Sequence, residues 1–112
     1  MRAVNTLRLA RRSVFFGPGP RQLLAEVEAL SSLRQATLKT GISYTKALRL
    51  LRAMERELGF AVVESVKGGS EHGGTRLTER GARLLHTYAE VEAEVAAYAQ
   101  QVVLEKLAFL EK

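Results

Sequence analysis

Residues 33–59 read LRQATLKTGISYTKALRLLRAMERELG and predict the architecture of the whole chain. The pattern indicates a short helix over 33–40 and, after a tight turn, a longer helix that runs to about Leu58. Gly41 can end the first helix, because glycine readily adopts the left-handed conformation found there. Ser43 can cap the second helix. Two helices joined by a glycine-containing turn form the helix-turn-helix pattern.

The chain before this stretch predicts a strand, a turn and a first helix. Residues 6–16 are rich in Leu, Val and Phe, and a Gly-Pro-Gly-Pro run follows them at 17–20. The apolar alternation changes phase along the strand, which favours a bulge near Arg11 and Arg12. Pro20 suits the first turn of a helix, and the apolar residues after it repeat at helical spacing.

The chain after the helix-turn-helix pattern predicts a hairpin and a long last helix. Residues 60–66 form an apolar, β-branched run, and 75–77 can pair with it. The glycine-rich segment 67–74 between them makes a long hairpin tip, the wing. Thr78 can cap a final helix that continues almost to Lys112, since no Pro or Gly follows its first turn.

The last helix carries apolar residues at intervals of four and three, which predicts a heptad seam interrupted by Glu105 and resumed at Phe109. One alternative is an amphipathic helix folded back on its own domain. The helix is too long for that, so the pattern favours a two-fold homodimer. The predicted interface is Leu84, Tyr88, Val91, Val95, Tyr98 and Val102.

The predicted fold class is therefore mainly α with a small β-hairpin. It is a winged helix-turn-helix over residues 1–77 with a long C-terminal dimerisation helix over 78–112, both within one domain. No segment reaches the roughly 20 apolar residues needed to cross a bilayer. We read neither a signal peptide nor an anchor, so the sequence predicts a cytoplasmic chain without a membrane partner.

Composition favours a polyanionic partner over catalysis or a metal site. Lys and Arg outnumber Asp and Glu by 17 to 12, a net charge of +5, and the chain has no Cys. His72 and His86 are too few and too far apart for a metal motif, and no cofactor is expected. The glycine-rich wing lacks the Gly-Lys-Ser/Thr of a phosphate-binding loop. With no catalytic constellation either, the sequence predicts a protein that is not an enzyme.

The longer helix of the pattern has two faces. Ala47, Leu51, Met54 and Leu58 form an apolar stripe, and Thr45 and three arginines including Arg56 lie opposite. Arginine can donate two hydrogen bonds to guanine or clamp phosphates, which favours double-stranded DNA. The alternative is an arginine face that is only solvated and paired with Glu55 or Glu57. The predicted DNA-binding residues are Ser43, Tyr44, Thr45, Lys46, Arg49 and Arg52 in the helix, with Lys67, His72 and Arg76 in the wing.

The motifs also carry a family resemblance. Ile42-Ser43, Leu58-Gly59 and Leu77-Thr78-x-x-Gly81 form a skeleton similar to that of LysR-type bacterial regulators. Gly41 to Tyr44, Ala47, Met54 and the double glycines of the wing resemble ModE-type, molybdate-responsive regulators more closely.

That resemblance implies a homodimeric, DNA-binding regulator of transcription. In ModE-type proteins a separate C-terminal half binds molybdate. We expect that half to be absent here, so that this chain binds no small-molecule effector. The competing interpretation is a winged-helix module that binds a protein instead of DNA.

Overall fold

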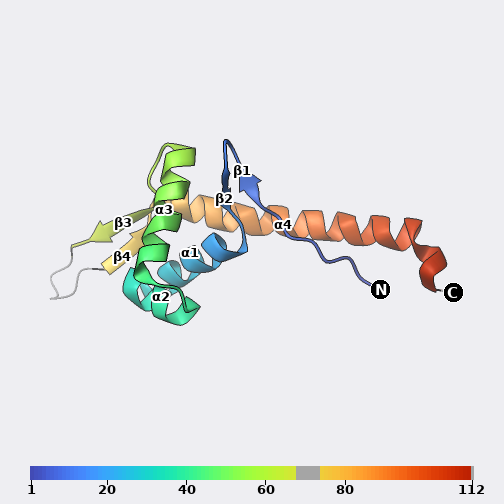
Figure 1. Ribbon diagram of the computed structural model, residues 1–112, viewed down its shortest axis with the longest axis horizontal. Helices are drawn as coiled ribbons and strands as arrows, with labels where there is room; N and C mark the ends of the chain where they lie inside the picture. Colours follow the sequence, from blue (N-terminus) through green and yellow to red (C-terminus); the bar gives the residue numbers. More distant parts are fainter. Residues whose placement is uncertain (68–73, 112) are drawn as a thin grey trace.

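The computed structural model describes residues 1–67 and 74–111, and it confirms a winged helix with a long C-terminal helix (Figure 1). The globular part lies at one end, and α4 projects from it, so that the molecule measures 63 × 28 × 23 Å. The elements in order are β1 (Leu9–Ala10), β2 (Val14–Phe16), α1 (Pro18–Leu30), α2 (Leu33–Thr40), α3 (Tyr44–Leu58), β3 (Val63–Val66), β4 (Gly74–Leu77), α4 (Glu79–Lys106) and the 3₁₀ helix η1 (Ala108–Glu111).

The helix-turn-helix forms as predicted, because each helix end carries its own stop or start signal. Gly41 ends α2 in the left-handed region with φ of 77°. The Ser32 hydroxyl caps α2 by accepting a hydrogen bond from the Gln35 amide at 3.1 Å. The Ser43 hydroxyl caps α3 in the same way, accepting from the Lys46 amide at 3.0 Å. These local bonds satisfy amides that the first turn of a helix leaves unpaired.

The predicted single N-terminal strand is wrong, since the chain reverses within it. β1 and β2 form a short antiparallel hairpin whose register shifts between Leu9 and Ala10. The Glu57 carboxylate of α3 accepts hydrogen bonds from the amides of Arg12 at 2.8 Å and Ser13 at 2.9 Å. The change of phase in the apolar alternation of residues 6–16 therefore marks a turn, and Glu57 of α3 holds this turn in place.

The Glu57 carboxylate also links this turn to pH. Its hydrogen bond from the Ser13 amide, more than that from Arg12, holds its pKa below the ordinary value. A carboxyl whose pKa is lowered by folding stabilises the fold above its unfolded pKa. That contribution is lost as the pH falls through the folded pKa.

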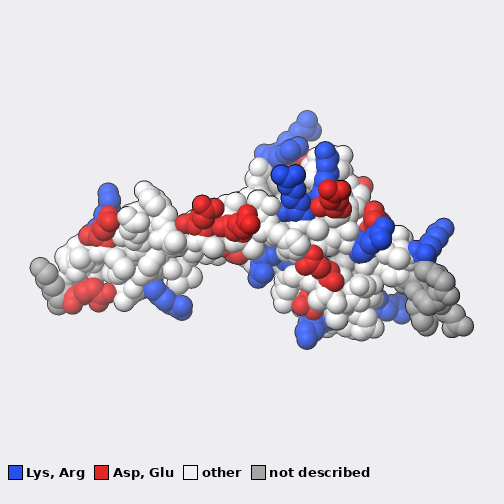
Figure 2. All heavy atoms as spheres, turned by 180° about the vertical axis from the view of Figure 1, so that it is seen from behind, with Lys and Arg blue, Asp and Glu red and all other residues white. Residues whose placement is uncertain are grey.

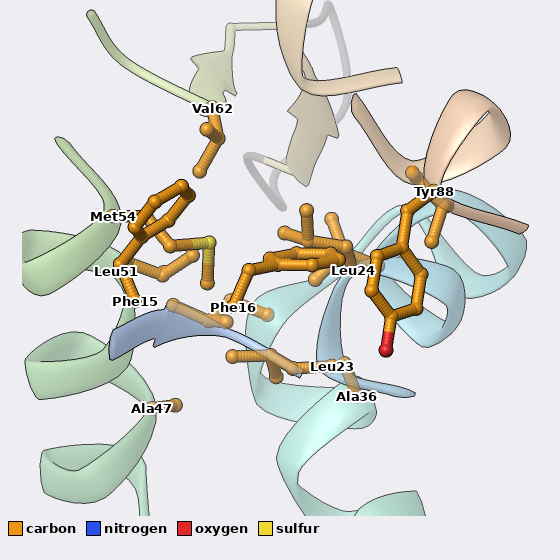
Figure 3. Close-up of a cluster of buried hydrophobic side chains, with 13 residues drawn as sticks. Phe15, Phe16, Leu23, Leu24, Ala36, Ala47, Leu51, Met54, Val62 and Tyr88 are labelled. Atoms are coloured by element: carbon orange, nitrogen blue, oxygen red, sulfur yellow. The ribbon is translucent and has the colours of Figure 1, made fainter. Parts of the chain in front are cut away.

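The core lies where the hairpin, α1, α2, α3 and the start of α4 converge (Figure 3). The side chains of β2 enter between helices that are distant in sequence. Apolar burial of this kind is the main favourable term in folding. The largest fully buried side chains are Phe16, Leu23, Leu24, Val27, Met54 and Val62.

Tyr88 belongs to this core, so its predicted place in the dimer seam is corrected. Its side chain is 2% exposed and packs edge-on against Phe16, with ring centroids 4.8 Å apart. Its hydroxyl donates to the Leu7 carbonyl at 2.6 Å. Burial, as the largest cause, raises the pKa of Tyr88. The ring ties α4 to the N-terminal segment of its own chain.

The start of α4 is fixed against the chain that leads into β3. The Thr78 amide donates to the Val62 carbonyl at 3.0 Å, and the Thr78 hydroxyl donates to the Ala61 carbonyl at 2.8 Å. A Cβ on Gly81 would lie only 2.1 Å from the Val62 oxygen. The Leu77-Thr78-x-x-Gly81 motif therefore lets α4 approach another backbone closely, and this sets the direction in which α4 projects.

The wing hairpin is attached to the end of α1. β3 and β4 pair antiparallel from Val63 opposite Leu77 to Val66 opposite Gly74, so β3 begins three residues later than predicted. The Thr75 amide donates to the Ser31 carbonyl at 3.0 Å. The base of the wing is thus held by the residue that ends α1.

The far half of α4 has little of its own chain beside it apart from the N-terminal segment (Figure 1). The Ala3 amide donates to the Gln100 side chain at 2.7 Å, and the N-terminal ammonium lies 3.1 Å from Glu111. The α-helix ends at Lys106, earlier than predicted, and η1 follows it.

Candidate nucleic-acid interface

The two faces predicted for the longer helix are confirmed in α3. Ala47, Leu51 and Met54 are buried in the core, while Leu58 at the end of the helix is half-buried. α2 and the turn support this helix from one side, and the β1–β2 hairpin contacts it from another. The opposite face is therefore turned to solvent by a helix that packs on its neighbours. Its exposed residues are Thr45, Lys46, Arg49, Arg52 and Arg56.

The N-terminal end of α3 adds hydrogen-bond donors to this face. Ser43 and Tyr44 are exposed, and half of the Tyr44 surface is accessible. The Ser43 oxygen accepts from the Lys46 amide, which leaves the hydroxyl hydrogen to donate outward. First-turn amides and the helix dipole also favour an anion at this position. We define the recognition face as Ser43, Tyr44, Thr45, Lys46, Arg49 and Arg52.

The wing residues are placed differently from one another. Lys67 is exposed at the end of β3. Arg76 is exposed too, but its Nε donates to the Glu64 carboxylate across the hairpin at 2.7 Å. Such exposed pairs contribute little to stability, so a phosphate can displace Glu64. His72 lies outside the described residues.

A further group of cations was not assigned to any site from the sequence. Arg11 and Arg12 of the hairpin turn lie with Arg56 around a hollow of about 490 Å³ at the C-terminal end of α3. Glu57 lines the same hollow and offsets part of the charge. The sequence alone does not indicate this cluster. It places Arg11 and Arg12 within one predicted strand, and only the reversal of the chain between β1 and β2 brings them to Arg56.

Charge is divided between the two ends of the molecule. Residues 1–83 contain 15 of the 17 Lys and Arg and 7 of the 12 Glu, a net charge of +8. Residues 84–112 have two Lys and five Glu, a net charge of −3. From behind, most of the visible Lys and Arg lie on the globular part, whereas a group of Glu lies along the middle of α4 (Figure 2). A polyanion is therefore attracted to the globular end.

Among residues 1–67 and 74–111, no three His, Cys, Asp or Glu side chains come together as metal ligands. Within the same ranges, no helix is long and apolar enough to cross a bilayer.

α3 packs on its neighbours and exposes a face of hydroxyl and cationic side chains, and the β3–β4 hairpin forms a wing. This arrangement defines a winged helix-turn-helix protein. No protein-family model matches the chain. Over 95 residues, 85% of its length, the chain is 33% identical to the molybdenum-pterin-binding protein MopB of Rhodobacter capsulatus. It is 33% identical over 87 residues, 78% of its length, to the transcriptional regulator ModE of Haemophilus influenzae. It is also 34% identical over 83 residues, 74% of its length, to the transcriptional regulator ModE of Yersinia pestis.

These matches confirm the resemblance predicted from the motifs: over most of its length the chain is related to the ModE-type regulators. The chain spans about a third of the length of the curated relatives it matches, with 35%, 34% and 31% of MopB and the two ModE proteins covered.

Proposed function

We propose that the chain binds double-stranded DNA in a sequence-specific way and regulates transcription as a homodimer. The observation that carries this proposal is the recognition face, which lies opposite the buried stripe of α3. The relatives named transcriptional regulator support it. The proposed arrangement is a DNA-binding part over residues 1–77 and a dimerisation helix over 78–112 of a single domain.

The side chains suggest a division of labour on DNA. Arg49 and Arg52 project from the middle of α3, where they can enter the major groove and donate pairs of hydrogen bonds to guanine. Ser43, Tyr44 and Lys46, at the start of the helix, suit phosphate or base-edge contacts. Lys67 and Arg76 suit phosphates beside the groove. In this proposal α3 selects the sequence and the wing adds affinity.

Replacing Arg49 with alanine tests the role of α3. If Arg49 binds a guanine with two hydrogen bonds, the variant should lose roughly 1–3 kcal/mol of binding free energy and relax the preference at one base pair. Selection of bound fragments from random DNA, followed by titration of the selected site, measures both. Arg2→Ala is the control, because it removes the same charge from the exposed N-terminal segment.

The Arg2→Ala variant should keep the full preference. A binding motif and affinity unchanged in Arg49→Ala would refute its role. Salt dependence separates DNA binding from the competing protein-binding module, because phosphate contacts weaken steeply as salt rises and apolar docking does not.

Replacing Lys67 and Arg76 together with alanine tests the wing. The double variant should bind all DNA sequences more weakly by a similar factor. Its plot of log affinity against log salt should become shallower by roughly one to two units, because phosphate contacts release counterions. The preferred sequence should stay the same. A changed preference with an unchanged salt slope would mean that the wing reads bases.

A further inference from the structure

Three arginines meet at the C-terminal end of α3, outside the recognition face. Arg11 and Arg12 come from the turn between β1 and β2, and Arg56 comes from the last turn of α3. Together with Ser13 and Glu57 they line the hollow of about 490 Å³. We call Arg11, Arg12 and Arg56 the arginine cluster. All three residues are exposed, so the cluster is open to a partner.

The position of the hairpin turn is set by the end of α3. The Glu57 carboxylate accepts hydrogen bonds from the amides of Arg12 and Ser13, and Arg11 Nη1 donates to the Glu57 carbonyl at 3.2 Å. These bonds engage the backbone of Arg12 and only one of the five N–H donors of the Arg11 guanidinium. Among residues 1–67 and 74–111, no member of the cluster forms an ion pair with a carboxylate. The turn is therefore held in place while its guanidinium donors stay available.

The hollow carries a positive charge despite the presence of Glu57. Three arginines and one glutamate line it, so its net charge is +2. The C-terminal end of α3 also bears the negative end of the helix dipole, which is equivalent to roughly half an elementary charge. The sum is still positive, so the hollow attracts an anion.

The arginine cluster continues the recognition face along α3. Arg49 and Arg56 are seven residues apart, which is about two helical turns, so they share one side of α3 and lie about 10 Å apart along its axis. The hairpin turn stands beside the end of α3 (Figure 1), and a group of Lys and Arg is seen at the same place from behind (Figure 2). A molecule that lies along the recognition face can therefore reach the cluster as well.

The dimensions of DNA indicate which of its groups would reach the cluster. The 15 residues of α3 span about 22 Å, whereas the major groove is about 12 Å wide. When α3 crosses the groove with Arg49 at its centre, the groove edge is only about 6 Å away. Arg56 then lies beyond this edge, where the sugar-phosphate backbone runs.

We infer that the arginine cluster binds phosphates of the DNA backbone at the edge of the major groove that α3 enters. This inference rests on the proposed DNA binding and adds a contact separate from the recognition face and the wing. The planar guanidinium suits phosphate, to which it can donate two parallel hydrogen bonds. Because phosphate contacts carry no sequence information, the cluster supplies affinity and fixes the position of α3 in the groove.

Replacing Arg11 and Arg12 together with alanine tests this contact. The amides that bond Glu57 belong to the backbone and remain, so the variant should fold, which circular dichroism checks. At about 0.1 M salt it should bind the selected DNA site on the order of tenfold more weakly, with a salt slope shallower by roughly one to two units. The preferred sequence should stay the same.

Two further double variants serve as controls. Arg2→Ala with Lys106→Ala removes the same charge at exposed positions, far from α3, and should keep the affinity within about twofold. Arg11→Lys with Arg12→Lys keeps the charge, so it should keep the salt slope of the parent. A lysine variant whose salt slope falls as far as that of the alanine variant would overturn a contact made through charge.

Ethylation interference locates the contact on the DNA. In the parent, ethylation should block binding at phosphates beneath the recognition face, the wing and the arginine cluster. The Arg11 and Arg12 alanine variant should lose sensitivity at one set of phosphates, different from the set lost when Lys67 and Arg76 are replaced. Loss at the same phosphates in both variants would overturn a separate contact.

The remaining outcomes separate this inference from the proposed function. A parent chain that selects no DNA sequence would overturn the proposed function and the contact with it. Selective binding by the parent, with unchanged affinity and salt slope in the Arg11 and Arg12 alanine variant, would overturn the contact alone. Binding of inorganic phosphate by the parent and not by that variant, again with an unchanged salt slope on DNA, would assign the cluster to a free anion and also overturn the contact.

Discussion

Replacing Gly81 with alanine is expected to prevent the chain from folding stably. The added Cβ would lie 2.1 Å from the Val62 carbonyl oxygen and 2.8 Å from its carbon. These are backbone atoms, which cannot rotate aside as a flexible side chain would. The Thr78 amide bonds the same carbonyl, so moving α4 away also breaks that contact. We expect a loss of about 4 kcal/mol or more, a large part of the total stability of a small domain.

Chemical denaturation followed by circular dichroism measures this effect. Gly19→Ala is the matched control, because Gly19 lies in α1 and a Cβ there meets nothing within 4 Å. That variant should stay within roughly 1 kcal/mol of the parent, because the gain of alanine over glycine in a helix is offset by the unfavourable position of a Cβ directly before Pro20. Equal stability of the two variants would show that α4 does not dock on Val62 as described.

Replacing Val91 and Val95 together with aspartate is expected to give folded monomers with greatly weakened DNA binding. Both valines are more than a third exposed in the single chain, so aspartate can be solvated there without loss of the core. In the proposed dimer the change places four carboxylates in one apolar seam, which opposes association. Loss of the second recognition face should lower the affinity for a two-fold site by about 100-fold or more.

Sedimentation and circular dichroism report association and folding separately. Ala89→Asp with Ala93→Asp is the control, because it adds the same charge at exposed positions of α4 outside the seam. The control should remain dimeric and bind DNA nearly as well as the parent. If the Val91 and Val95 variant also sediments as a dimer, the interface lies elsewhere.

The local sequence determined the helices and the recognition face. Ser32, Gly41, Ser43, Gly59 and Thr78 act on residues three or four positions away, so their caps could be predicted from the spacing alone. The two faces of α3 also follow from its 3.6-residue period. For the same reason the residues of the recognition face could be named before any contact was known.

Only the tertiary structure decided what the apolar residues of α4 and the N-terminal segment contact. Tyr88 has the heptad spacing of the seam, yet it bonds Leu7, which is 81 positions away, and packs in its own core. The hairpin turn at Arg12 is held by Glu57, 45 positions away. An apolar hollow lined by Leu9, Phe60 and Leu84 arises in the same way, from three separate stretches of chain. The spacing of apolar residues along a helix shows which of them share a face. Whether that face is buried depends on the segments, distant in sequence, that pack against it.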